Sequence, residues 1–355
     1  TLVRKYRIMV RKYDYSFLKK DISGSCISLL SIIYDIKGKE SERLESSPSL
    51  FNKLKKKAIR DSIKASNAIE NIHTTEKRIN QIASGDNVAQ SHSEKEIIGY
   101  RNVLNNIHTL NEEIKFDETT ILDIHNQLLK EADIAGRGHY KTEPNVISEK
   151  RNGKSYIIFV PTRPDEVEES LNQALLAYQE AIHDPEINPL LLIPCFILDF
   201  LCIHPFDDGN GRMSRLLTLL LLYKCGFDIG RYISIEKVIN DTKEDYYDAL
   251  YKSSINWHEN TNDYSHFILY MIRVIYRCYK QLDKNVFDMI DKKLNKSERI
   301  EYLLLNTFVP LSKHQIMEQL PDVSENLVET ILSRLISEGK IIKIGTYKDA
   351  MYYRK

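Results

Sequence analysis

The sequence predicts a mainly α-helical protein in which a single short β-hairpin interrupts the helices. Its 355 residues include only 13 Gly and 10 Pro, and apolar residues recur at helical intervals over most of the chain. Before residue 291, only the stretch 144–161 has the runs of β-branched and aromatic residues that are typical of strands. At about 150 residues per domain, the length corresponds to two or three domains. The composition excludes disordered, collagen-like and low-complexity classes.

Helices are expected wherever apolar residues recur every three or four positions before residue 291, namely over 15–36, 50–72, 93–113, 118–131, 165–183, 188–203, 210–225, 242–256 and 263–290. The polar stretch 37–47 is interpreted as a connection. Strands are expected at 145–147 and 156–160, around a tight turn at Asn152-Gly153. Because a two-stranded hairpin is marginal alone, it has to pack on helices, and its edge can pair with an extended peptide. A hairpin that only packs is the alternative.

Charge and cysteine usage exclude several functions. The 50 Lys and Arg balance 50 Asp and Glu, so a nucleic-acid role would have to be local. The five cysteines are scattered and form no CxxC pair, which predicts reduced, buried thiols. The longest apolar run, 190–198, is shorter than the ~20 residues of a membrane helix. We therefore expect a cytoplasmic protein without a membrane segment.

The last part of the chain has a different pattern. Helices are expected at 299–306, 312–319 and 324–338, followed by strands at 340–344 and 350–354, an order that resembles a winged-helix module. We assign this module to residues 297–355. Its third helix begins with acidic residues, whereas a helix that enters a DNA groove needs Arg or Lys there. A protein partner is therefore favoured, and DNA binding is the alternative.

The residues most informative about chemistry lie at 204–215, with the sequence HPFDDGNGRMSR, between two strongly apolar helices. Glycines let backbone N–H groups approach an anion closely, and the start of the following helix adds its positive end. Two arginines three residues apart can meet phosphate oxygens, a carboxylate can hold Mg²⁺, and an imidazole can exchange a proton near neutral pH. The stretch therefore predicts a phosphate site.

This stretch also matches the signature HPFx[D/E]GNGRxxR at every specified position, so the chain resembles the Fic-domain family. Fic proteins are mostly nucleotidyl transferases that move AMP from ATP to a Ser, Thr or Tyr hydroxyl of a target protein. The resemblance implies a Fic-type helical bundle over 91–290, with the hairpin at 144–160 as a flap that aligns the target. It also implies roles within the signature, with His204 as the base, Phe206 as a buried anchor, Asp208 as the Mg²⁺ ligand, Gly209, Asn210 and Gly211 as the anion hole, and Arg212 and Arg215 as the phosphate clamp. Upstream, Gly138-His139-Tyr140-Lys141 is similar to the family's Gly-x-Tyr-Arg, with Lys in place of Arg, which argues against a bidentate contact there.

A second motif lies upstream in the N-terminal helical region, residues 1–90. The segment Ser66 to Asn71 matches the family's inhibitory motif [S/T]xxxE[G/N]. On its helix, Glu70 continues an apolar stripe toward the core, where a carboxylate needs a cation. From the residues alone, a solvated or locally capped Glu70 is the alternative. The resemblance implies that Glu70 pairs with Arg212, occupies the place of the γ-phosphate and keeps basal activity low.

Together these observations predict a protein adenylyltransferase that uses ATP and Mg²⁺ to modify a target protein or itself. The alternatives are a deAMPylase or bifunctional enzyme in which Glu70 positions water, a Fic-type transferase of another nucleotide or phosphate group, and a winged-helix DNA-binding regulator. Tyr246, Tyr247 and Trp257 are near enough in sequence to border a base, but core packing is the favoured interpretation. A homodimer is compatible with the sequence.

Overall fold

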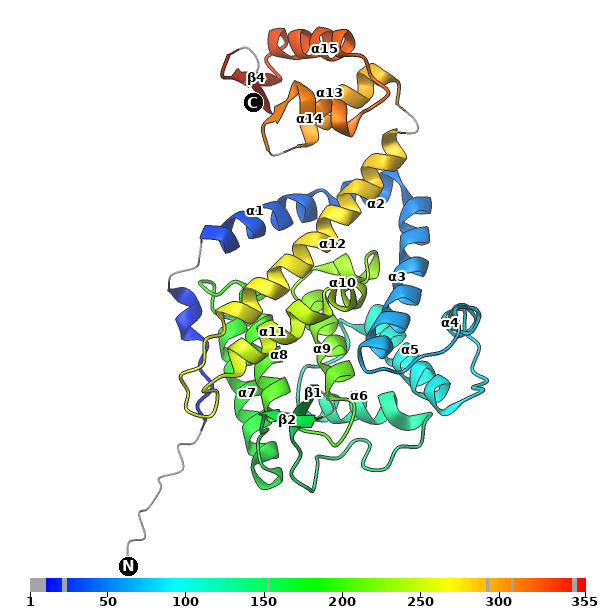
Figure 1. The fold of residues 1–355 in the computed structure, drawn as a ribbon, viewed down its shortest axis with the longest axis vertical. Coiled ribbons are helices and arrows are strands. Elements are labelled where there is room, and N and C mark those ends of the chain that lie inside the picture. The colour runs from blue at the N-terminus through cyan, green and yellow to red at the C-terminus, as the bar shows by residue number, and fades with distance from the viewer. Residues whose placement is uncertain (1–10, 21–23, 152–153, 292–293, 308, 347–349) are drawn as a thin grey trace, which may run out of the picture. The chain divides into compact units, whose positions relative to one another are not determined.

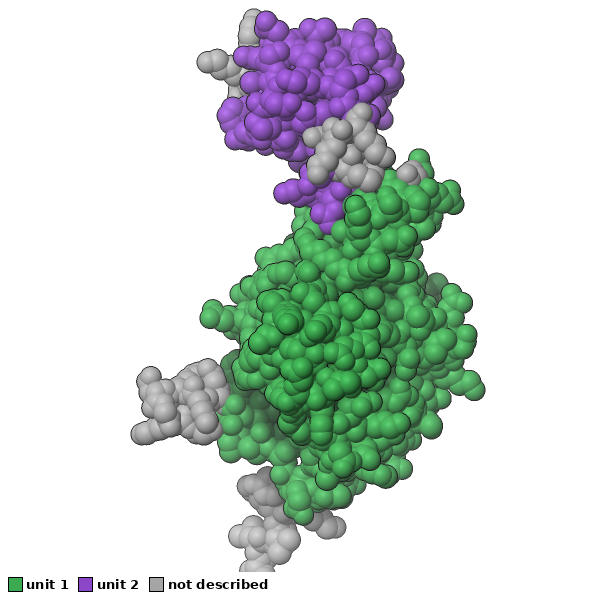
Figure 2. All heavy atoms as spheres, turned by 90° about the vertical axis from the view of Figure 1, so that its right-hand side faces the viewer, with its two compact units in different colours: residues 1–282 green, residues 283–355 purple. Residues whose placement is uncertain are grey.

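The computed structural model describes residues 11–20, 24–151, 154–291, 294–307, 309–346 and 350–355. The chain divides into two compact units, residues 1–282 and 283–355 (Figure 2). The boundary falls within the long helix α12 (Ser265–Asp291). Each unit has its own architecture and is described separately.

Two central helices dominate the first unit. α8 (Pro189–Ile203) lies between α7 (Val167–Ile182) and α9 (Asn210–Lys224), and it packs against both (Figure 1). Nearly every side chain of α8 and α9 is buried, because both sequences are apolar around most of their circumference. The loop 204–209 joins these two helices, so its ends are held by buried scaffolding.

The N-terminal half of this unit supplies the helices that approach α9. The elements are a 3₁₀ turn η1 (Ser16–Lys19), α1 (Gly24–Gly38), α2 (Glu40–Ser46), α3 (Pro48–Ile69), α4 (Glu76–Ala83), α5 (His92–Leu110) and α6 (Glu118–Lys130). Both α3 and α5 pack against α9, and α5 also packs against α3 and α6. Side chains from two different helices can therefore reach the first turns of α9.

A short hairpin follows α6. β1 (Ile147–Arg151) pairs antiparallel with β2 (Lys154–Phe159), and a register shift falls between Ile147 and Ser148. The predicted turn at 152–153 lies outside the described residues. The unit is completed by η2 (Pro164–Glu166), η3 (Asp228–Arg231), α10 (Ile235–Asp241), α11 (Lys243–Ser254) and α12.

A buried carboxylate ties the N-terminal segment to α8. Asp199, on α8, is fully buried and accepts hydrogen bonds from the Tyr15 hydroxyl (2.8 Å) and the Trp257 indole Nε1–H (2.6 Å). The Arg11 guanidinium lies 3.2 Å from the same carboxylate and supplies the opposite charge. Because these donors come from distant parts of the chain, Asp199 holds the segment around Tyr15 and the loop of Trp257 on α8.

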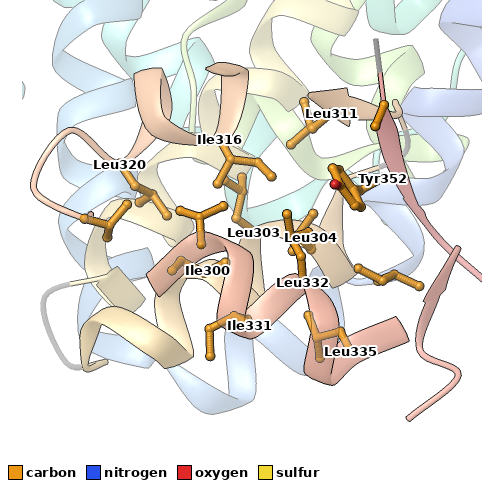
Figure 3. Close-up of a cluster of buried hydrophobic side chains, with 14 residues drawn as sticks. Ile300, Leu303, Leu304, Leu311, Ile316, Leu320, Ile331, Leu332, Leu335 and Tyr352 are labelled. Atoms are coloured by element: carbon orange, nitrogen blue, oxygen red, sulfur yellow. The ribbon is translucent and has the colours of Figure 1, made fainter. Parts of the chain in front are cut away.

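The second unit contains α13 (Lys296–Asn306), β3 (Leu311–Ser312), α14 (Lys313–Gln319), α15 (Glu325–Ser337), β4 (Ile341–Ile344) and β5 (Met351–Arg354). Its sheet has the strand order β3-β5-β4, with both pairs antiparallel. The buried side chains between the helices and the sheet form one hydrophobic cluster, which includes Ile300, Leu304, Ile316, Leu332, Leu335 and Tyr352 (Figure 3). The unit therefore has a core of its own.

The predicted mainly helical fold with small antiparallel sheets is confirmed, and the differences concern short elements. The first strand of the hairpin was expected at 145–147 and lies at Ile147–Arg151. α2 occupies most of the stretch expected to be a connection, and α4 and α10 were not predicted. These helices have seven or eight residues, too few to show a repeated apolar pattern. The helix expected over 15–36 consists of η1 and α1, with residues 21–23 outside the described part. Among the described residues, no helix is long and apolar enough to cross a membrane.

Candidate active site

The loop 204–209 is held between its two helices by the side chain of Asn210, the residue that follows it. His204 ends α8 in the left-handed conformation, at φ 50°, and Gly209 precedes α9 at φ 83°. Asn210 accepts a hydrogen bond from the N–H of Phe206 (3.1 Å) and donates one to its carbonyl oxygen (2.7 Å). The buried Asn210 amide therefore fixes the loop between the two helices, so the sequence GN at 209–210 serves loop closure here.

The ring of Phe206 is fully buried and anchors the loop in the core. It stacks on the imidazole of His125 with a centroid separation of 3.6 Å and an interplanar angle of 9°. His125 lies on α6, and burial lowers its pKa to about 4. The imidazole is therefore neutral near pH 7.

His125 also fixes the backbone of the loop, a role that sequence reasoning did not find. Its Nδ1 accepts a hydrogen bond from the N–H of Gly138 (3.0 Å), so the proton of the neutral ring is on Nε2. Nε2–H then donates to the carbonyl oxygen of Asp208 (3.0 Å). One imidazole thus connects the segment before the hairpin to the loop that carries Asp208. The sequence signal was a single His between the buried residues Ile124 and Leu128, which is typical of ordinary core packing.

His204 is oriented by a hydrogen bond to its own helix. Its Nδ1 lies 3.2 Å from the carbonyl oxygen of Leu201, which can only accept, so Nδ1 carries the hydrogen of the neutral ring. Burial, together with a smaller contribution from the nearby Lys141, lowers the pKa of His204 to about 4. The other ring nitrogen, Nε2, then carries the lone pair that can accept a proton.

Lys141 occupies the position where the sequence departs from the Gly-x-Tyr-Arg pattern. Its ammonium donates to the side-chain oxygen of Asn145 (2.8 Å) and to the carbonyl oxygen of Ile203 (3.4 Å), and its backbone N–H donates to Pro205 (2.9 Å). Burial lowers the pKa of this lysine to about 8. Lys141 therefore ties the segment before the hairpin to the end of α8 through single bonds rather than a bidentate contact.

The N-terminus of α9 is an anion-binding position. No side chain caps its first turn, because Gly209 is the N-cap residue and has none. A Cβ atom at Gly211 would lie 2.2 Å from Oε1 of Glu70, so the carboxylate of Glu70 rests directly on this turn. A carboxylate at a helix N-terminus is stabilised by the helix dipole, as a phosphate would be.

The ion pairs of this region differ from the sequence prediction. The prediction that Glu70 pairs with Arg212 is wrong, since its Oε1 lies 2.8 Å from Nη2 of Arg215. Ser66 completes this contact, because its hydroxyl and its carbonyl oxygen each accept a hydrogen bond from Arg215 at 2.9 Å. Ser66 and Glu70 are four residues apart on α3 and face the same guanidinium.

Arg212 points to a different helix. Its Nη1 lies 2.8 Å from Oε2 of Glu96, on α5, and its Nη2 lies 3.3 Å from Oδ2 of Asp208. The two arginines of the predicted clamp are one turn apart on α9, and each is engaged by a carboxylate from a separate helix. Glu96 was missed from the sequence because 116 residues separate it from Arg212 and no motif marks it.

Asp208 is the candidate ligand for a divalent cation. Its side chain is half-exposed, and its Oδ1 accepts a hydrogen bond from the N–H of Gly209 (2.6 Å). Among the residues that the structure describes, no group of three or more His, Cys, Asp or Glu side chains is placed to hold a metal. A single carboxylate beside an anion site fits Mg²⁺, which commonly takes one or two protein carboxylates and completes its shell with phosphates and water.

The three aromatic residues that follow this region differ in burial. Tyr246 and Trp257 are buried, as the packing interpretation predicts, whereas Tyr247 is 44% exposed. Trp257 donates to Asp199 in the buried cluster on α8. Tyr247 lies close enough to Glu70 for that carboxylate to raise its pKa, although burial is the larger cause. Of the three, only Tyr247 is exposed beside the site.

Comparison with known proteins identifies the family. Residues 115–222 match the model of the Fic/DOC family, and this range contains His125 and the whole stretch 204–215. The chain therefore contains a Fic domain. It is 31% identical over 119 residues to Protein adenylyltransferase Fic of Nematostella vectensis, covering 33% of this chain and 24% of that protein. It is also 25% identical over 197 residues to Protein adenylyltransferase fic-1 of Caenorhabditis elegans, covering 53% and 34%. This Fic-domain protein therefore spans about a quarter to a third of the length of these two relatives.

Solved structures support the fold. A Fic family protein from Desulfovibrio desulfuricans superposes with a TM-score of 0.62 at 20% identity, covering 95% of this chain and 98% of that one. Fic-1 from C. elegans superposes with a TM-score of 0.52 at 19% identity, covering 76% and 74%. At these identities the likeness establishes the Fic fold of the bundle.

Proposed function

We propose that this Fic-domain protein is a protein adenylyltransferase whose resting state is inhibited by Glu70. It transfers AMP from ATP to a Ser, Thr or Tyr hydroxyl of a target protein or of its own chain. One observation carries the proposal: the loop that presents Nε2 of His204 leads directly into an uncapped helix N-terminus, and a carboxylate occupies that terminus. The adenylyltransferase names of two relatives support the same reaction.

The transfer uses groups that the structure brings together. Nε2 of His204 takes the proton of the target hydroxyl, and the oxygen forms a bond to the α-phosphorus of ATP. The bond from that phosphorus to the bridging oxygen breaks, pyrophosphate leaves, and the imidazolium returns its proton to solvent. Because the pKa of His204 is about 4, the ring is unprotonated near pH 7 and ready to act as a base.

The first turn of α9 stabilises the charge that develops in this step. Negative charge grows on the α-phosphate oxygens, and backbone N–H groups of Gly209, Asn210 and Gly211 are fixed there before the substrate arrives. Mg²⁺ held by Asp208 and phosphate oxygens would supply further charge neutralisation. Arg215 provides a buried cation one turn along the same helix.

Inhibition follows from the position of Glu70. Its carboxylate takes both the N-terminal turn of α9 and the guanidinium of Arg215, two groups that a triphosphate needs. Its side chain is one third exposed and lies at the end of α3, so it can leave without disturbing the core. ATP has to displace this carboxylate to bind in a productive orientation.

The hairpin is the proposed docking site for the target hydroxyl. Its second strand exposes Tyr156 and Ile157, and an exposed apolar strand pair suits an extended peptide. The end of the hairpin is held by His258, which donates to the carbonyl oxygen of Val160 (2.8 Å) and stacks on Phe159. The hairpin is thus fixed at its base, and Tyr156 and Ile157 of its second strand are exposed.

We assign protein binding rather than DNA binding to the second unit, which we regard as winged-helix-like from its strand order β3-β5-β4. Several of its described cations are engaged by carboxylates of the same unit. Lys313 pairs with Glu325 (3.5 Å) and Glu329 (2.5 Å), and Lys340 pairs with Glu301 (2.8 Å). Paired cations contribute little to phosphate binding. A gel shift with random duplex at low salt should show no binding, and a salt-dependent shift would favour the DNA alternative.

The transferred group is tested with two labelled substrates. The full chain carrying Glu70→Gly is incubated with Mg²⁺ and ATP labelled either at the α-phosphate or at the γ-phosphate. Adenylyl transfer places the α label on protein and leaves the γ label in pyrophosphate. Incorporation of the γ label would instead indicate phosphate transfer, and incorporation of neither label would refute the proposed function.

A further inference from the structure

Arg212 depends on a carboxylate outside the Fic signature. Its side chain is 1% exposed, and its Nη1 donates to Oε2 of Glu96 at 2.8 Å. Its Nη2 lies 3.3 Å from the half-exposed carboxylate of Asp208. Within the part of the chain that the structure describes, Nε of Arg212 has no hydrogen-bond partner. The orientation of this buried guanidinium is therefore set by its two amino groups alone.

We propose that Glu96 is a positioning residue, which holds Arg212 so that Nη2 faces the loop at Asp208 and can bind a nucleotide phosphate. This inference rests on the proposed function, because it assigns a task within the same site. Glu96 contacts no reacting atom and acts through Arg212. Without it, the weaker contact with Asp208 would be the remaining constraint on the guanidinium.

Glu70 and Glu96, the two carboxylates that pair with the arginines of the signature, lie in different structural settings. Glu70 is the C-cap residue that directly follows α3, and the next residue, Asn71, has φ 60°. Glu96 lies in the second turn of α5, a 19-residue helix that packs against α3, α6 and α9. A carboxylate at a helix end can swing away when a ligand arrives, whereas one within a packed helix stays in place. Glu70 therefore suits a removable inhibitor, and Glu96 suits a permanent support.

The start of α5 is itself fixed by a charged network. Arg78, on α4, donates to both oxygens of Glu94, at 3.1 and 3.0 Å. Glu94 also accepts hydrogen bonds from the N–H of Gln90 (2.7 Å) and the hydroxyl of Thr74 (2.8 Å). Glu94 and Glu96 are two residues apart, so this network holds the turn of α5 that carries Glu96.

The two contacts of Arg212 differ in length and burial, which would allow one of its partners to be exchanged when a ligand binds. The contact with Glu96 is short and mostly buried, whereas the contact with Asp208 is longer and reaches a half-exposed carboxylate. A phosphate oxygen can replace Asp208 at Nη2 while Nη1 stays on Glu96. The same exchange releases the carboxylate of Asp208 to bind a cation. Glu96 thus holds Arg212 in place while the partner of Nη2 changes from Asp208 to a phosphate.

The test is a double-mutant cycle in the full chain carrying Glu70→Gly. Glu96→Ala, Arg212→Ala and the double variant are compared for ATP affinity by calorimetry, for kcat and KM of AMP incorporation, and for melting temperature. Glu112→Gln replaces an exposed carboxylate just after α5 and is the matched control. We expect Glu96→Ala to weaken ATP binding and to lower kcat by about 10- to 100-fold, the range typical of a misplaced catalytic contact. In the Arg212→Ala background, the same change should have no further effect on ATP affinity.

Conservative variants keep the proposal testable if Glu96→Ala folds poorly. Glu96→Asp retains the charge on a shorter side chain and should recover part of kcat, whereas Glu96→Gln should not. Tighter ATP binding or faster AMP incorporation in Glu96→Ala would overturn the proposal and make Glu96 a second inhibitory carboxylate. The proposal would also be overturned if the losses of ATP affinity caused by Glu96→Ala and Arg212→Ala were additive in the double variant. If the parent chain binds ATP but transfers no AMP, the proposed function fails, and the cycle on ATP affinity still decides whether Glu96 positions Arg212.

Discussion

The carboxylate of Glu70 and the backbone of Gly211 are in direct contact across two helices. A methyl group at position 211 would lie 2.2 Å from Oε1 of Glu70 and 3.0 Å from its Cδ. The glycine therefore does more than allow a phosphate to approach α9. It also makes room for the side chain of Glu70, which is proposed to take the place of a phosphate.

Gly211→Ala tests this contact by stability rather than activity. The new methyl group should displace Glu70 and break its pair with Arg215, which lowers the free energy of unfolding by about 1 to 2 kcal/mol. In the Glu70→Gly background the clash is absent, and alanine should stabilise the helix by roughly 0.5 kcal/mol, because glycine is the poorer helix former. Chemical denaturation of the four variants measures both effects. Equal effects of Gly211→Ala in the two backgrounds would contradict the contact.

We expect the protein to lose stability in acid, because His125 is buried in its neutral form. Its pKa falls from an ordinary 6.5 to about 4 in the folded protein, chiefly because it is buried. Below pH 6.5 the unfolded chain takes up a proton that the folded chain does not, so stability decreases as the pH falls from about 6.5 to 4. The contribution at pH 4 is on the order of 3 kcal/mol.

The measurement for His125 is the free energy of unfolding as a function of pH. His125→Gln keeps an amide that can donate to the Asp208 carbonyl and does not titrate, so its pH profile should be flatter over this interval. Its stability near pH 7 should be lower, because the stacking on Phe206 is lost. A variant whose profile is parallel to that of the parent would show that His125 is not the titrating group.

His204→Ala should separate nucleotide binding from transfer. The imidazole is expected to take the proton of the target hydroxyl, whereas the helix N-terminus and the arginines bind the phosphates. In the Glu70→Gly background we therefore expect ATP affinity to stay within about threefold while AMP incorporation falls below detection. Calorimetry and α-labelled ATP give the two quantities. Residual incorporation above about a tenth of the parent rate would exclude His204 as the base.

Lys243 is predicted to stabilise the inhibited state. Its ammonium donates to the carbonyl oxygen of Ile69 at 2.8 Å, in the last turn of α3 and next to Glu70. A cation at a helix C-terminus satisfies a carbonyl group that has no partner within the helix. Lys243→Met should therefore loosen the end of α3 and raise basal AMP incorporation a few-fold, less than Glu70→Gly does.

Lys252→Met, on the same helix α11, is the control for Lys243. Lys252 is exposed and pairs with Asp248, away from α3. Its replacement should leave incorporation unchanged. Equal rates for the two lysine variants would remove Lys243 from the inhibitory contact.

Much of the scaffold was predictable because it is encoded locally. α8 and α9 are apolar around most of their surface, and the polar loop between them contains the residues that end one helix and begin the next. The same holds for the second strand of the hairpin, β2, which has β-branched and aromatic residues. The first strand, β1, was expected at 145–147 but lies at Ile147–Arg151, where every residue after Ile147 is polar and gives no strand signal. Short polar helices such as α2 have no such signal, because seven residues give less than two repeats of the helical period.

The site was less predictable because its geometry depends on helices far apart in sequence. Spacing places Arg212 and Arg215 near each other on α9, but it does not say which of them faces α3 and which faces α5. The partner of Glu70 was therefore assigned wrongly. His125 and Glu96 contact the loop and α9 from α6 and α5, and their roles follow only from how these helices pack.

In the proposed inhibited state, Glu70 occupies the position that a phosphate of ATP needs. The most direct test compares the initial rate of AMP incorporation, from α-labelled ATP with Mg²⁺, in the wild-type chain and in Glu70→Gly, with Glu70→Gly/His204→Ala as the blank and Glu113→Gly as an exposed carboxylate control. We expect a rate about 10- to 100-fold higher in Glu70→Gly than in the wild type, and no change in the control. Equal rates in the wild type and Glu70→Gly, both above the blank, would contradict it.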